Sequence, residues 1–111
     1  MSEITNEYMM EMLAKSKNYT LVLLKEGPNV DIPGIDKLIW EHARENFKLR
    51  ADGLLSIVCP VTEENTIKGI GIFTADKKSV KAIMDEDPAV QQGLFVYEML
   101  DVKSFPGDAL G

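Results

Sequence analysis

The stretch Gly34 to Ala51, GIDKLIWEHARENFKLRA, has the apolar spacing of an amphipathic helix and carries the only histidine of the chain. At about 100° per residue, His42 lies at the centre of the apolar side. The other side chains on that side are Ile35, Leu38, Ile39, Asn46 and Leu49. A titratable imidazole therefore occupies a position where a leucine is expected. It is either a core histidine held by one hydrogen bond or a pocket residue with a chemical role.

The size of the chain predicts one domain, spanning residues 1–111, with a core at about 19–105 and a leading helical segment at 1–17. Of its residues 45% are hydrophobic, and the net charge is -6. That charge argues against nucleic acid and anionic membranes as partners, because both require a basic face. We therefore expect neither nucleic-acid binding nor membrane binding.

Cysteine content and the N-terminal composition indicate a compartment. The single cysteine, Cys59, excludes a disulfide within the chain and fits a reducing environment. One Cys and one His cannot supply a structural zinc site. The first residues, MSEITNEYMMEM, lack the basic and then apolar order of a signal peptide. We expect a soluble cytoplasmic protein.

Four apolar segments have the length and composition of β-strands. Tyr19–Leu24 is a near-continuous apolar run, which predicts a central strand buried on both faces. Leu54–Val61 is the second strand, and Pro60 must lie at its end or on an edge because proline cannot donate to a ladder. Ile67–Thr74 and Leu94–Val102 alternate in the manner of a third and a fourth strand.

Capping patterns predict three further helices. Residues 5–16 carry apolar side chains at helical spacing, with Thr5 as a cap, and we expect this helix to pack on the outside of the domain. Asp76 is a suitable N-cap for a second helix. Asp87 is the predicted N-cap of a short third one, with Pro88 at its first position and Gly93 as its terminator.

The predicted order is β-α-β-β-α-β with an extra N-terminal helix, which is the ferredoxin-like arrangement of α+β proteins. Its four-stranded antiparallel sheet has both main helices on one face. The other face still needs cover, and apolar residues occur on both sides of Tyr19–Leu24 and Leu94–Val102. A second copy of the chain is the expected cover, which predicts a homodimer with its sheets packed face to face.

The chemistry that His42 can perform depends on which side chains contact its ring. Both main helices lie on the same sheet face, so Asp87, which local pattern assigns to capping, can also reach the imidazole. Cys59 has two interpretations: a small buried apolar residue, or a thiolate near His42, which requires exposure. Pro60 follows it at the strand's end.

The order of the motifs resembles the YciI-like, or YCII-related, family over roughly residues 19–105. The resemblance rests on the histidine in WEHARENF, the strand LLSIVCPV, the glycine-rich GIGIFTAD and the DPAVQQG signature. It implies a dimeric α/β-barrel assembly and a pocket centred on a His–Asp pair, here His42 and Asp87, with Cys59 and Pro60 at the pocket. Many relatives carry Gly where this chain has Cys59.

The resemblance also implies a small-molecule enzyme, since one branch of the family is associated with dehydrochlorination of chlorinated hydroquinones. A His–Asp pair suits general acid–base chemistry of lyase or isomerase type on a small cyclic or aromatic compound. These residues require no metal and no cofactor. The alternative is a module that binds or senses a small ligand without catalysis. A purely structural dimerisation domain, which needs no pocket, is the third class.

Overall fold

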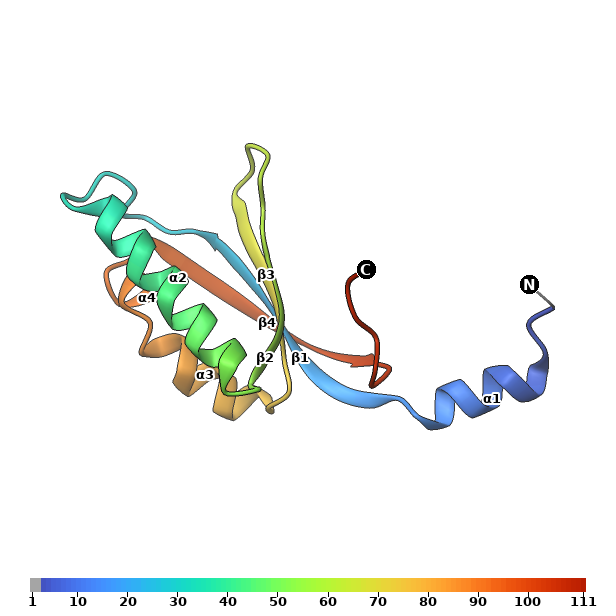
Figure 1. Cartoon of the computed structure of the whole chain (residues 1–111). Coiled ribbons are helices and arrows are strands. Elements are labelled where there is room, and N and C mark those ends of the chain that lie inside the picture. Colours follow the sequence, from blue (N-terminus) through green and yellow to red (C-terminus); the bar gives the residue numbers. More distant parts are fainter. Residues whose placement is uncertain (1–2) are drawn as a thin grey trace.

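The computed structural model describes residues 3–111, and residues 1–2 of the predicted leading segment lie outside that range. A four-stranded sheet of order β2-β3-β1-β4, antiparallel throughout, carries α2, α3 and α4 on one face (Figure 1). This confirms the predicted ferredoxin-like α+β arrangement. In chain order the elements are α1 (Asn6–Ala14), β1 (Lys17–Glu26), α2 (Ile35–Ala51), β2 (Leu55–Pro60), β3 (Ile67–Phe73), α3 (Lys77–Asp85), α4 (Pro88–Gln91) and β4 (Phe95–Ser104).

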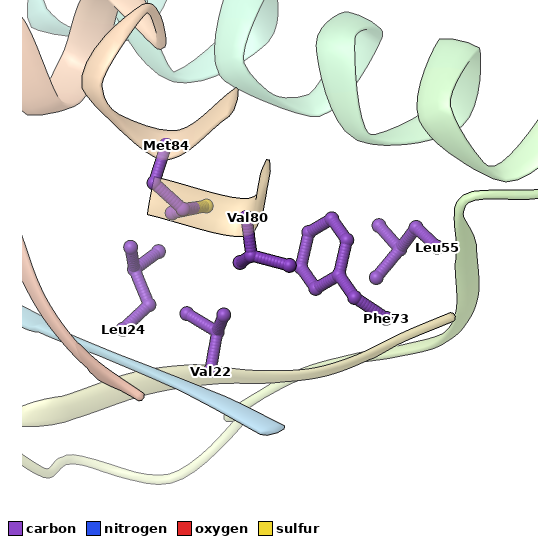
Figure 2. Close-up of a cluster of buried hydrophobic side chains, with 6 residues drawn as sticks. All are labelled: Val22, Leu24, Leu55, Phe73, Val80 and Met84. Atoms are coloured by element: carbon purple, nitrogen blue, oxygen red, sulfur yellow. The ribbon is translucent and has the colours of Figure 1, made fainter. Parts of the chain in front are cut away.

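The core lies between the sheet and α3, where side chains from both layers interdigitate (Figure 2). Strand alternation directs every second residue of the sheet toward the helices, and the i, i+4 pair on α3 meets them. Burial of these side chains supplies the hydrophobic stabilisation of the domain. The cluster consists of Val22, Leu24, Leu55, Phe73, Val80 and Met84.

The prediction that β1 is buried on both faces is wrong for the single chain. Thr20, Val22 and Leu24 are buried under the helices, whereas Leu21 and Leu23 on the opposite face are half-buried. β1 is central in the sheet, as predicted, but helices cover only one side of it. Its apolar residues on the second face therefore face outward.

α1 is a capped helix that stands apart from the domain. The Thr5 hydroxyl accepts a hydrogen bond from the backbone N–H of Tyr8 at 3.1 Å, as its position as a predicted cap requires. The expectation that this helix packs on the domain is wrong, because none of its residues is buried and it extends away from the sheet (Figure 1). Only Lys15 and Ser16 separate it from β1.

α3 is fixed at its N-terminus by a cap and near its C-terminus by a tyrosine. The Asp76 carboxylate accepts from the backbone N–H of Ser79 at 2.9 Å, which confirms the predicted N-cap. Tyr97 of β4 donates its hydroxyl hydrogen to Asp85 at 2.6 Å. Burial, helped by the Asp85 carboxylate, raises the pKa of Tyr97 to about 12. The phenol therefore remains a donor at neutral pH and holds α3 against β4.

A close backbone contact fixes the position of α4. Gly27, just after β1, donates its N–H to the carbonyl of Leu94 at 2.7 Å. Asn29 donates its backbone N–H to the Gly93 carbonyl at 3.0 Å. A Cβ added at Gly27 would lie 2.2 Å from the Gly93 carbonyl oxygen, so only glycine allows this approach. The loop after β1 thereby holds the end of α4 in place.

We predict that Gly27→Ala lowers the free energy of unfolding by about 1–3 kcal/mol, because the added methyl forces the two backbones apart. Urea denaturation followed by circular dichroism measures this. Gly69→Ala is the matched control, since its added Cβ would meet nothing closer than 3.6 Å. A Gly27→Ala variant as stable as Gly69→Ala would show that the contact does not constrain the fold.

Candidate functional site

His42 and Asp87, 45 residues apart in the chain, meet in a short hydrogen bond. His42 Nδ1 lies 2.7 Å from Asp87 Oδ2, and both residues are buried. α2 carries the histidine and the N-terminus of α4 carries the aspartate, and these two helices pack against each other. His42 is the only buried residue of α2. The remaining residues of the predicted apolar side are half-buried or exposed.

Asp87 has a second role, which its sequence context predicted. Its Oδ1 accepts the backbone N–H of Ala89 at 2.8 Å and so caps α4. Pro88 follows at the first position of the helix, and Gly93 adopts φ 77° just beyond its end, both as predicted. The two carboxylate oxygens therefore have different partners, and the capping bond orients the oxygen that contacts His42.

The hydrogen bonds define one tautomer of the neutral His42 ring. A carboxylate only accepts, so Nδ1 carries the hydrogen and Nε2 carries the lone pair. Asn46 lies one turn further along α2 and places its Nδ2 3.3 Å from Nε2, where it donates. Phe95 packs against the ring with a centroid distance of 5.0 Å and an interplanar angle of 58°. The imidazole is thus held at both edges and supported at one face.

A cavity of about 220 Å³ lies beside the ring, between α2 and the β2–β3 part of the sheet. His42 and Asn46 belong to its wall, whereas Asp87 contacts the ring at Nδ1 and is not part of the wall. Gly69 and Gly71 of β3 contribute to the opposite side, where an added Cβ would lie 3.6 Å from the Cys59 carbonyl oxygen at Gly69 and 3.1 Å from the Leu55 side chain at Gly71. An apolar cavity of about 150 Å³ accommodates benzene, so this one has room for one ring with small substituents.

Cys59 and Pro60, the residues predicted at a pocket, both line this cavity. The interpretation of Cys59 as a buried apolar residue is wrong, because the residue is exposed. β2 is an edge strand and leaves that side of the residue uncovered. Pro60 closes β2 at the edge of the sheet, where a missing N–H donor is tolerated, as expected.

The sequence offered no role for Asn46 or Phe95. Asn46 lies on the same side of the helix as His42, and their i, i+4 spacing is the sequence signal for a contact. Phe95 lies in β4 and reaches the ring only through the folding of the whole sheet. No local pattern marks such a contact.

Metal sites and membrane-spanning helices are the other features that concern the described residues. Within residues 3–111, no group of three or more His, Cys, Asp or Glu side chains is arranged to hold a metal ion. In the same range, no helix is both long and apolar enough to traverse a lipid bilayer.

The chain is similar in structure to 5-chloro-2-hydroxyhydroquinone dehydrochlorinase (TftG) from Burkholderia phenoliruptrix AC1100, solved in complex with 2,5-dihydroxybenzoquinone. The TM-score is 0.50 with 16% sequence identity, over 78% of this chain and 90% of the dehydrochlorinase chain. At that identity the likeness shows a shared fold. No family model matches the chain, and no curated protein matches it in sequence.

We predict that Asp87→Asn reverses the His42 tautomer while preserving the cap. An asparagine that accepts from Ala89 with its oxygen turns its amide N–H groups toward Nδ1, so the ring hydrogen moves to Nε2. Long-range ¹H–¹⁵N correlation spectra of the imidazole report which nitrogen is protonated.

Asp87→Ala is the comparison variant, because it removes both bonds. We expect it to lower the free energy of unfolding by about 0.5–2 kcal/mol for the lost cap, whereas Asp87→Asn remains close to the wild type. An unchanged tautomer in Asp87→Asn would contradict the proposed direction of the hydrogen bond.

Proposed function

We propose that the protein is a small-molecule enzyme of lyase or isomerase type, a divergent YciI-like protein that uses His42 as general acid and base. The observation that supports this proposal is the buried His42, which is bonded to Asp87 and lies at the wall of an apolar cavity of about 220 Å³. A histidine oriented by a carboxylate beside a cavity is the arrangement that general acid–base catalysis uses.

In this proposal His42 Nε2 takes a proton from a carbon or hydroxyl group of the substrate. The electron pair left behind forms a new double bond, and a leaving group departs or the proton returns at another atom. Asp87 keeps its bond to Nδ1–H and stabilises the positive charge that develops on the ring. Proton transfer of this kind contributes about 10²–10⁴-fold to a rate.

The substrate class follows from the size and composition of the cavity. Pockets for drug-sized ligands run to about 300–1,000 Å³, so this cavity accepts a single small ring and not a nucleotide. Its wall includes Leu55, Val58 and Phe73, which favour an apolar ring. The backbone of Cys59 and the ring of Pro60 bound the cavity at the sheet edge and limit substituents there. The dehydrochlorinase of similar fold, whose structure holds a single-ring compound, illustrates this size class.

One observation favours the alternative, a ligand-binding module without catalysis. Asn46 already contacts Nε2, so a substrate must displace or rotate the amide before it reaches the lone pair. In a binding module the same contact would remain in place. Turnover, and not binding, separates the two functions.

We predict that His42→Gln abolishes turnover and retains the fold. A panel of small phenols and lactones serves as substrate, with product formation followed by mass spectrometry and binding by calorimetry. Loss of the proton acceptor is expected to lower kcat by about 10²–10⁴-fold. The matched control is Glu45→Gln, an exposed residue of the same helix, which should leave kcat unchanged.

Gly69→Val tests the cavity independently, because the added side chain starts from a position with no atom within 3.6 Å and fills the space. Ligand binding should fall at least tenfold while thermal stability is preserved. Undiminished turnover in His42→Gln would overturn the assignment of the base. Binding of the panel without any turnover by the wild type would replace the enzyme with the ligand-binding module.

We also propose that two copies associate through the sheet face that the helices leave open. The strand register places nine apolar side chains on that face beside the ion-paired Lys25 and Glu98, and Val96 and Leu100 of β4 are 44% and 49% exposed. A large exposed apolar area of this kind on a single chain is typical of an interface. Its apolar members are Tyr19, Leu21, Leu23, Ile57, Ile70, Ile72, Val96, Leu100 and Val102.

Leu100→Glu is predicted to convert a wild-type dimer into a monomer, since a carboxylate would be buried without a partner. Analytical ultracentrifugation at micromolar concentration measures this. Trp40→Gln removes an equally large exposed side chain from α2 and should leave the dimer intact. A wild-type monomer under these conditions would contradict the proposed interface.

A further inference from the structure

α1 is an amphipathic helix whose apolar side chains contact no core. Ile4, which precedes it, and Tyr8, Met9, Met10 and Leu13 are between 47% and 72% exposed. Helices shorter than about 12 residues are marginal in water unless an apolar face packs on something. With nine residues and a formed cap, α1 requires a surface to pack on.

A groove of about 680 Å³ offers such a surface at one end of the sheet. One wall is the outer side of the second half of α2, with Phe47 and Arg50, and the floor includes Ile57 of β2. The other wall is the C-terminal tail, residues 104–110. Phe47 and Leu110 are largely exposed and make the groove apolar.

The groove and the base of α1 lie at the same end of the domain. Tyr19, two residues into β1, lines the groove, and Ser104, which pairs with Lys17, ends β4 beside it. α1 nevertheless points away from the domain, and Ser16 in the short connection donates its hydroxyl hydrogen to the Leu13 carbonyl at 2.8 Å (Figure 1). Two copies that meet at this end bring each α1 toward the groove of the other.

One charge of the groove complements those of α1. Glu7 and Glu11 lie on one side of α1 at a spacing of four residues, and Glu3 precedes them at the same spacing. At the groove, Arg50 makes no ion pair within residues 3–111, and the tail contributes Asp108 to the lining. Arg50 is therefore the cationic partner that the groove offers to an acidic apolar helix.

We propose that α1 of each copy docks in the groove of a second copy, with its apolar side against Phe47, Ile57 and the tail and its glutamates near Arg50. The exchange is reciprocal, as two-fold symmetry requires. It goes beyond the acid–base function and does not depend on it. It adds a second contact to the sheet-to-sheet interface and gives both exposed apolar surfaces a partner.

Cross-linking between single-cysteine chains tests the arrangement. In full-length protein with Cys59→Ser, one chain carries Leu13→Cys and a second chain, of different mass through a tag, carries Phe47→Cys. A short bismaleimide should join the two in the mixture, with the linked peptides identified by mass spectrometry. The control pair combines Leu13→Cys with Trp40→Cys, which lies outside the groove and should give at least tenfold less product.

Both cysteines are then placed on one chain. An intrachain product there, with no product between chains, would show that α1 folds back on its own groove and would overturn the proposal. Equal yield from the Trp40 control pair would also overturn it. A dimer that forms without the α1-to-groove product would leave the sheet-to-sheet interface standing and remove only the exchange.

Charge reversal provides the second measurement. Arg50→Glu should weaken association roughly fivefold at low salt, and Glu7→Arg in the same chain should restore it. The effect should diminish at about 0.5 M salt, which screens exposed pairs. Lys37→Glu, at the other end of α2, is the control and should not change the association constant. Association of Arg50→Glu as tight as that of the wild type would overturn the docking.

Discussion

One carboxylate connects the folding of this domain to its candidate chemistry. Asp87 caps α4 with one oxygen and binds the His42 ring with the other, so the ring is oriented only when α4 is formed and placed. The placement of α4 depends on the contact between Gly27 and Gly93, at which no side chain larger than hydrogen fits. A glycine that does not line the cavity therefore helps to fix the geometry of the site.

Local rules made most of the architecture predictable from the sequence. The caps at Asp76 and Asp87 and the turn at Gly93 obey preferences that act over three or four residues, and the structure confirms them. The order of strands and helices was sufficient to specify the ferredoxin-like sheet. The sequence is compatible with a contact between His42 and Asp87 but does not establish it, because their distance depends on how two helices pack. The exposure of Cys59 could not be predicted for a similar reason, since it depends on which strand lies at the edge of the sheet.

The two wrong packing predictions have one physical origin. A strand such as β1, apolar on both faces, indicates that both faces are covered, but it does not say by what. The single chain supplies cover for one face only, and Leu21 and Leu23 on the other remain half-buried. α1 poses the same problem, because its apolar residues imply packing and the chain offers no contact. Apolar patterning indicates that a surface is covered, whereas a single chain shows only the cover that it supplies itself.

The His42 ring has a hydrogen-bond partner at each of its nitrogens. A structural imidazole needs one hydrogen bond to remain in place, and Asp87 supplies it. Asn46 adds a partner at the second nitrogen whose amide can present either an N–H group or an oxygen. Nε2 therefore has a partner whether it carries a proton or not, and the ring can change its charge without a change of position. Because Nε2 is also the nitrogen that Asp87 leaves unbound, the proton exchange that we propose would take place there after rotation of the Asn46 amide.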